Sequence, residues 1–180
     1  MGTDPTGSSG VVDRLSGEAG RLLERLAALG WSLGSAESLT GGLISATVVS
    51  VPGASRVFAG SVVAYDPAVK LEVLGVDPQL VEQAGTVDEQ VAVQMATGAR
   101  RVLGVDLALA TTGVAGPGPS EGHPAGTVWL AGATASGVRT RLLTLSGGRP
   151  EVRTGAVRAA LALGREVTLS ADGGAGYGGA

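Results

Sequence analysis

Hydrophobic and polar residues follow two periods along the chain, one typical of helices and one typical of strands. Apolar residues at helical spacing predict helices over residues 11–29, 43–51, 67–74, 88–103 and 150–169, with a further helical turn over 77–83. Short apolar runs predict strands over residues 31–36, 57–65, 106–111, 127–134 and 138–145. Helices alternate with strands and a hairpin closes the series. The order therefore predicts an α/β fold, a three-layer α/β/α sandwich around a mixed sheet in a single domain.

The two ends and one internal stretch break this pattern. Residues 1–10 and 171–180 are rich in small and polar residues without apolar periodicity, which predicts flexible tails around a domain of residues 11–170. Residues 112–119 are dense in glycine and proline, and this predicts a loop that continues through His123 to Pro124.

The composition of the chain bears on which partners, metals and cofactors are expected. The 180 residues are 44% hydrophobic, which is enough for one core, and the net charge of −3 without a basic stripe argues against a nucleic-acid partner. With no cysteine and the single His123, we expect no metal site and no cofactor. No apolar run is long enough for a membrane span and the first ten residues lack a secretory-signal pattern. We therefore expect no membrane partner and a cytoplasmic location.

A hydroxyl- and glycine-rich turn joins the first predicted strand to the next helix. Ser38 lies in this turn, close to the helix N-terminus, where free backbone N–H groups favour negative charge. The backbone around Thr40, Gly41 and Gly42 is a candidate oxyanion site. The alternative is that Ser38 or Thr40 only caps the helix. Glu37 either caps backbone amides or is an exposed carboxylate.

Lys70 is the only lysine among thirteen cationic residues. Arginine stays protonated in proteins, whereas a desolvated lysine can lose its proton and act as the general base that a serine nucleophile needs. The alternative is an ordinary solvent-facing lysine. Tyr65, at the end of the second predicted strand, can reach Ser38 or Lys70 through its hydroxyl, or can be a core residue with an exposed hydroxyl.

Two further groups are candidate ligand contacts, and the first of them suits a phosphate. Arg149 and Arg153 lie four residues apart at the start of the last predicted helix, beside its free N–H groups. They can equally form a solvated face with Glu151. Thr112 and Gly113 open the glycine-rich stretch after the third predicted strand, where the backbone can approach a ligand or simply turn.

Six motifs in order resemble the carboxy-terminal domain of the CinA family, which includes nicotinamide-nucleotide amidohydrolases. The motifs are Ala36-Glu-Ser-Leu-Thr-Gly-Gly42, Tyr65-x4-Lys70, Gly85-Thr-Val-Asp-Glu89, Thr112-Gly-Val-Ala-Gly-Pro117, Pro124-Ala-Gly-Thr-Val128 and Gly148-Arg-x3-Arg153. The sequence departs from the family pattern at Leu39, where many members have cysteine, at Asp88, where many have serine, and at Asp66-Pro67.

The resemblance implies hydrolysis of the carboxamide of nicotinamide mononucleotide to nicotinate mononucleotide and ammonia, without a metal. Ser38 would be the nucleophile, Lys70 the general base, and Tyr65 the residue that positions the pair. The substrate would contact eight residues, namely Glu37, Thr40, Gly41, Gly42, Thr112, Gly113, Arg149 and Arg153.

Two other functions fit the same residues. One is a non-catalytic module of the same fold that binds a nucleotide or a protein partner, and the other is a serine amidase for a different small amide. The exposed edge of the predicted hairpin also suggests self-association, with a homodimer as the expected form.

Overall fold

The computed structural model describes residues 8–172 as a single α/β domain. The helices are α1 (Ser8–Leu29), α2 (Leu43–Val49), α3 (Pro67–Glu72), α4 (Pro78–Ala84), α5 (Glu89–Leu103) and α6 (Arg149–Asp172), with a short 3₁₀ helix at Ala54–Arg56. The strands are β1 (Leu33–Glu37), β2 (Phe58–Val63), β3 (Leu107–Gly113), β4 (Thr127–Thr134) and β5 (Gly137–Thr144).

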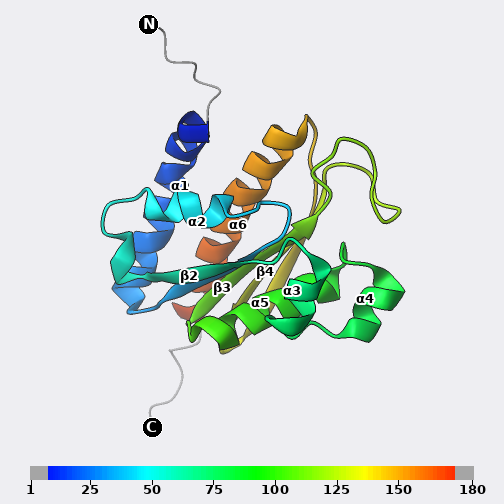
Figure 1. Cartoon of the computed structure of the whole chain (residues 1–180). Helices are drawn as coiled ribbons and strands as arrows, with labels where there is room; N and C mark the ends of the chain where they lie inside the picture. Colours follow the sequence, from blue (N-terminus) through cyan, green and yellow to red (C-terminus); the bar gives the residue numbers. More distant parts are fainter. Residues whose placement is uncertain (1–7, 173–180) are drawn as a thin grey trace, which may run out of the picture.

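The five strands form one mixed sheet in the order β2-β1-β3-β4-β5. Strand β1 pairs in parallel with β2 and β3, whereas β4 runs antiparallel to both β3 and β5. Helices cover both faces of the sheet, as Figure 1 shows. The predicted three-layer fold around a mixed sheet is therefore confirmed.

Two apolar cores lie on opposite faces of the sheet. Leu107 and Leu109 of β3 point to the core shared with α1, α2 and α6, while Ala108 and Ala110 point to the core shared with α5. Successive strand residues face opposite sides, so this central strand is buried on both. The alanine face lets α5 pack close to the sheet.

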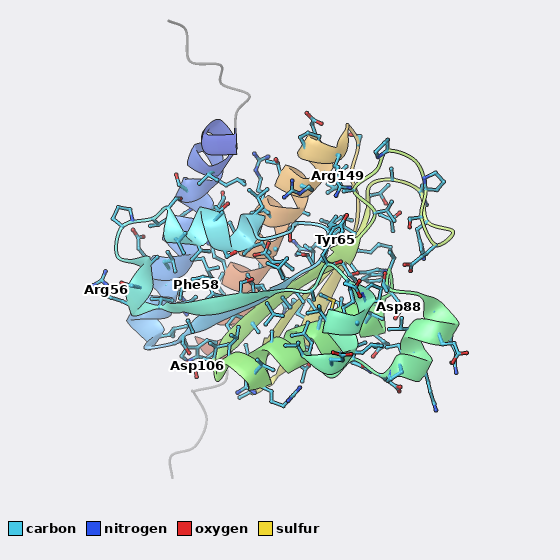
Figure 2. All side chains as sticks on the ribbon, in the orientation of Figure 1. Arg56, Phe58, Tyr65, Asp88, Asp106 and Arg149 are labelled. Atoms are coloured by element: carbon cyan, nitrogen blue, oxygen red, sulfur yellow. The ribbon has the colours of Figure 1, made fainter. Side chains whose placement is uncertain are left out.

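The start of β3 is fixed to the residue that precedes β1. Asp106 accepts hydrogen bonds from the backbone N–H of Ser32 at 2.8 Å and from its hydroxyl at 2.7 Å. These bonds lower the pKa of the Asp106 carboxyl, the backbone bond having the larger effect. Asp106 lies at the end of the sheet opposite to Tyr65 and Arg149 (Figure 2), so this contact fixes the strand register far from the candidate site.

Several boundaries differ by a few residues from the sequence predictions, and three of these differences concern the predicted loop and tails. The predicted loop that begins at Thr112 is wrong at its start, because Thr112 and Gly113 belong to β3 and pair with β4. Helix α1 begins at Ser8 and α6 ends at Asp172, so both helices run into the predicted tails. The remainder of both tails lies outside the described residues.

Two properties bear on possible partners. Among residues 8–172, none of the helices combines the length and the apolar character that crossing a bilayer requires. Strand β5 forms one edge of the sheet and exposes 40% of Val138 and 51% of Leu142. Self-association through this edge stays a prediction.

The strand order places a crevice at the carboxyl end of β1. The chain leaves β1 through α2 on one face of the sheet, and it leaves β2 toward α5 on the other face. Where consecutive connections depart on opposite faces, the ends of the neighbouring parallel strands are left uncovered. Ser38 directly follows β1 and therefore lies in this crevice.

Candidate active site

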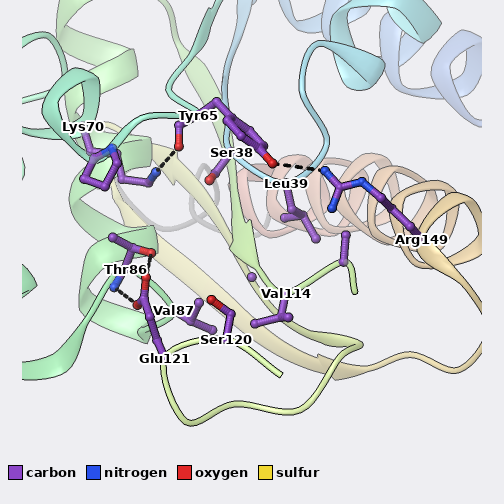
Figure 3. Close-up of a pocket in the computed structure, with 13 residues that line it drawn as sticks. Ser38, Leu39, Tyr65, Lys70, Thr86, Val87, Val114, Ser120, Glu121 and Arg149 are labelled. Atoms are coloured by element: carbon purple, nitrogen blue, oxygen red, sulfur yellow. Dashed lines mark hydrogen bonds between the residues drawn. The ribbon is translucent and has the colours of Figure 1, made fainter. Parts of the chain in front are cut away.

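Ser38 is held at the end of β1 by its own backbone. Its N–H donates to the carbonyl of Thr111 on the neighbouring strand at 3.0 Å, and its carbonyl accepts from the N–H of Gly41 at 3.0 Å. The side chain is 9% exposed and points into a pocket (Figure 3). Its hydroxyl forms no hydrogen bond with any other residue in the range 8–172, so the oxygen is available to a ligand.

Glu37 lies beneath this turn and is fully buried. Its carboxylate accepts from the backbone N–H groups of Ile44 and Ser45, each at 2.9 Å, and from the hydroxyl of Ser45 at 3.0 Å. The hydroxyl of Ser61 on β2 donates at 3.2 Å. Glu37 therefore caps α2 and fixes the turn from below. It does not line the pocket, and its predicted contact with substrate finds no support in this geometry.

Lys70 is buried in α3, with 1% of its surface exposed. Its Nζ donates to the carbonyl of Ala64 at 2.7 Å and to that of Tyr65 at 3.4 Å. Burial lowers the pKa of the Lys70 ammonium, while the carboxylates of Glu121 and Asp66 act in the opposite direction. The alternative of a solvent-facing lysine is excluded.

Ser38 and Lys70 line the same pocket, which has a volume of about 240 Å³. The side chains come from separate elements, because Ser38 follows β1 while Lys70 lies on the helix that follows β2. The remaining lining residues are Leu39, Tyr65, Pro67, Thr86, Val87, Gly113, Val114, Ala115, Ser120, Glu121 and Arg149.

Tyr65 and Arg149 meet at the mouth of the pocket. The Tyr65 hydroxyl accepts from Nη2 of Arg149 at 3.2 Å, and Nη1 of Arg149 donates to the carbonyl of Gly116 at 3.0 Å. Tyr65 is 62% exposed. The prediction that its hydroxyl bonds Ser38 or Lys70 is wrong, since only its backbone carbonyl contacts Lys70.

Arg153 does not line the pocket that Arg149 lines. Its Nε donates to the carbonyl of Leu39 at 3.1 Å, and its Nη2 donates to that of Thr40 at 2.6 Å. On a helix, residues four apart share a face, but these two guanidinium groups reach different parts of the loops above it. Arg153 thus holds the Ser38 turn, and the predicted pair of phosphate-binding arginines is reduced to Arg149.

The predicted oxyanion turn also differs in detail. The N–H of Gly41 is already bonded to Ser38, and Thr40 bonds Thr111 through its hydroxyl at 2.8 Å. Thr40, Gly41 and Gly42 do not line the pocket, whereas Leu39 does. Tertiary packing turns this segment so that its early residues, rather than the glycines, face the pocket.

The two residues predicted at the end of β3 have different positions. Thr112 is buried and its hydroxyl donates to the carbonyl of Thr86 at 2.6 Å, so it supports the pocket wall from behind. Gly113 lines the pocket itself. A side chain at Gly113 would collide with the backbone of Thr127 and Val128, so close strand packing requires glycine here.

Sequence reasoning missed the acidic wall of the pocket. Glu121 reaches the pocket from the loop between β3 and β4 and accepts from the N–H of Thr86 at 2.5 Å and from its hydroxyl at 2.8 Å. Thr86 belongs to the motif Gly85-Thr-Val-Asp-Glu89, but the sequence assigned no contact or function to it. Nothing in the local pattern distinguishes Glu121 from a solvated loop carboxylate, because its partner lies 35 residues away.

Fold and site together define a small α/β domain whose pocket, at the carboxyl ends of parallel strands, places a free serine hydroxyl with a buried lysine. The family model of the CinA C-terminal domain matches residues 17–168. The chain belongs to this family.

Relatives and solved structures support the assignment. A CinA-like protein of Frankia casuarinae is 43% identical over 174 residues, which are 91% of this chain and 39% of that protein. A CinA-like protein of Fervidobacterium nodosum is 43% identical over 124 residues, covering 68% of this chain and 30% of that protein. The chain thus spans two fifths or less of the length of these relatives.

Two solved structures match this chain over nearly their own full length. The crystal structure of a CinA superfamily protein from Klebsiella pneumoniae has a TM-score of 0.84 at 32% identity, and it covers 87% of this chain and 98% of its own. The competence/damage inducible protein from Agrobacterium tumefaciens has a TM-score of 0.82 at 33% identity, with coverages of 94% and 99%.

Proposed function

We propose that the protein hydrolyses the carboxamide of nicotinamide mononucleotide, giving nicotinate mononucleotide and ammonia. The observation that carries the proposal is that the only lysine of the chain is buried in the pocket that also contains the free hydroxyl of Ser38. A buried ammonium is costly, and an arginine would keep its charge there. A titratable cation at this place is suited to proton transfer.

The reaction runs in two halves. In the first, the Ser38 oxygen bonds to the carboxamide carbon while Lys70, neutral beforehand, takes the hydroxyl proton. Lys70 then gives that proton to the nitrogen as the C–N bond breaks, and ammonia leaves an acyl ester on Ser38. In the second half, Lys70 takes a proton from a water molecule while the oxygen of that water attacks the ester. The proton returns to the Ser38 oxygen when the acid leaves.

The developing oxyanion needs donors close to Ser38. The backbone N–H of Leu39, which lines the pocket, follows the nucleophile directly, and the N–H of Gly41 is already used. One well-aimed donor contributes on the order of 3 kcal/mol to the transition state. Arg153 supports this by holding the carbonyls of Leu39 and Thr40, which fixes the turn that directly follows this donor.

Arg149 is the group best placed for the phosphate of a mononucleotide. Its guanidinium is exposed at the mouth of the pocket, and its partners there are a phenol and a carbonyl, both neutral. A phosphate can replace these contacts with charge-assisted, bidentate hydrogen bonds.

The direct test is ammonia release from nicotinamide mononucleotide by wild type, Ser38→Ala and Lys70→Arg proteins. Ser50→Ala, on the exposed end of α2, is the matched control for loss of a serine hydroxyl. We expect release by wild type and Ser50→Ala only, because Lys70→Arg keeps the charge but removes the titratable base. Full activity in Ser38→Ala would refute the nucleophile.

Substrate choice is tested separately. Arg149→Ala should mainly raise KM for the mononucleotide and leave kcat nearly unchanged, because the phosphate is remote from the reacting carbon. Equal turnover of free nicotinamide by wild type would favour an amidase for another small amide. A folded wild type without any turnover would favour a binding module of the same fold.

A further inference from the structure

Glu121 has an unusually constrained position for a loop carboxylate. It lies in a tight turn closed by reciprocal hydrogen bonds between Ser120 and His123, with a positive φ of 52°. Its carboxylate bonds the Thr86 N–H at 2.5 Å and the Thr86 hydroxyl at 2.8 Å. Gly85 leaves room for this contact, since a Cβ there would overlap the Glu121 carboxylate. The acid is therefore held in the pocket wall by the surrounding chain.

The pocket has a negative and a positive side. Glu121 and Arg149 lie on different sides of it, and Ser38 lies near Tyr65 (Figure 3). Each Glu121 oxygen accepts one hydrogen bond from Thr86, and a carboxylate has about four acceptor positions, so the charge is still available to a ligand. A ligand that carries an anion at one end and a cation in its ring matches this arrangement.

We propose that Glu121 is the counter-ion of the substrate's pyridinium ring and makes the pocket select cationic N-alkylated pyridine carboxamides over neutral ones. This inference rests on the proposed function. The ring of nicotinamide mononucleotide carries a fixed positive charge because its nitrogen is bonded to ribose. With Arg149 on the phosphate, the charged ring would lie on the Glu121 side of the pocket, and the exposed ring of Tyr65 offers a second favourable surface for a cation.

The same contact between Glu121 and the pyridinium ring would prepare Lys70 to act as the general base. The charged groups around Lys70 are Glu121 from the loop and Asp66 from the start of α3, and the Tyr65–Arg149 pair stands at the pocket mouth. Both carboxylates raise the pKa of Lys70 against the effect of burial. A pyridinium beside Glu121 offsets that attraction, so the pKa of Lys70 should fall when the substrate binds.

The binding test uses the Ser38→Ala protein, which cannot form the acyl ester. Calorimetry compares nicotinamide mononucleotide with its reduced form, whose ring is neutral. We expect the cationic form to bind about five- to tenfold more tightly, as for a partly exposed ion pair. Adding Glu121→Gln should abolish the difference. Adding Thr86→Val, which removes one hydrogen bond and no charge, should preserve it.

Three results would overturn the proposal: equal affinity for the two ring forms, a preference that survives Glu121→Gln, or no measurable binding of either form. Ammonia release by wild type is scored separately. No release with an intact ring preference would reject hydrolysis and keep the counter-ion. Release of ammonia without a preference for the cationic ring would support hydrolysis and reject the counter-ion role of Glu121.

The titration of Lys70 provides a second readout. Because the chain has one lysine, protein labelled with ¹³C-lysine gives a single Cε signal that reports on Lys70 alone. In the Ser38→Ala protein, the cationic mononucleotide should lower the pKa of Lys70 and the reduced form should lower it less. When Glu121→Gln is added to this protein, the pKa of Lys70 should be lower than in the Ser38→Ala protein before any ligand is added. An unchanged titration in that variant would contradict the inferred coupling.

Discussion

The contact between α5 and the segment that follows α3 predicts a large effect of one methyl group. Gly98 lies in the middle of α5, and an added Cβ would be 1.9 Å from the carbonyl oxygen of Leu74. Leu74 is buried, and its carbonyl also accepts from Arg101 at 3.2 Å. The obstacle is backbone, which cannot move aside as a side chain can. Gly98→Ala should therefore push α5 away from the segment that follows α3.

The size of the effect follows from that distance. Side-chain Cβ atoms essentially never approach closer than 3.0 Å, so the two backbones must separate by at least about 1.1 Å, the difference between 3.0 Å and 1.9 Å. Overpacking of this kind costs about 3 kcal/mol. Alanine regains about 1 kcal/mol through its higher helix propensity. We expect a net loss of about 2 kcal/mol in the free energy of unfolding.

Urea unfolding of Gly98→Ala beside Gly17→Ala tests this reasoning. Gly17 is exposed in α1 with no atom within 4 Å of an added Cβ, so the same substitution should stabilise by about 0.5–1 kcal/mol. The two variants should thus differ by about 3 kcal/mol, and Gly98→Ala should also lose amidase activity as α3 shifts. Equal stability of the two would show that the α5 contact is not a steric limit.

Three further predictions concern the site. Arg153→Ala should lower kcat about tenfold and leave KM within about twofold, because the substitution removes the hydrogen bonds to the carbonyls of Leu39 and Thr40 and does not change a ligand contact. A change in KM alone would contradict this role of Arg153. Glu37→Gln should lower the free energy of unfolding in urea by about 2 kcal/mol, since the amide replaces one of two accepting oxygens at the start of α2; wild-type stability would refute the buried cap. Burial lowers the pKa of Lys70, so the unfolded chain binds this proton more tightly, and the free energy of unfolding should rise as pH increases toward the ordinary value of 10.5. Urea unfolding measured from neutral pH upward should show a weaker dependence of stability on pH in Lys70→Met than in wild type. The same pH dependence in both proteins would oppose a desolvated lysine.

Local sequence patterns predicted the elements because each element has its own period and its own terminal signals. Asp66, Asp77 and Asp88 each accept a hydrogen bond from a backbone N–H two residues later, as expected for residues that begin helices. The misplaced end of β3 has a tertiary cause. Thr112 and Gly113 look like loop residues, yet pairing with β4 extends the strand through them.

The composition identified Lys70 as an exceptional residue, and the turn chemistry identified Ser38. Their shared pocket depends on the strand order, which places the ends of β1 and β2 side by side. The functions of Tyr65 and Arg153 could not be predicted, because helical or strand spacing fixes where a side chain starts and not which distant carbonyl or hydroxyl it reaches. Arg153 and the carbonyl of Thr40 are separated by 113 residues.

The sequence by itself determined which segments become helices and strands, the α/β class of the domain, and which side chains are able to react. These properties depend on neighbours within a few residues, whose preferences the local pattern records. Only the tertiary structure decided that Lys70 is desolvated, that Glu121 joins the pocket wall, and that Arg153 serves the Ser38 turn. Desolvation and long-range hydrogen bonds exist only after distant segments pack together, and no local period carries that information.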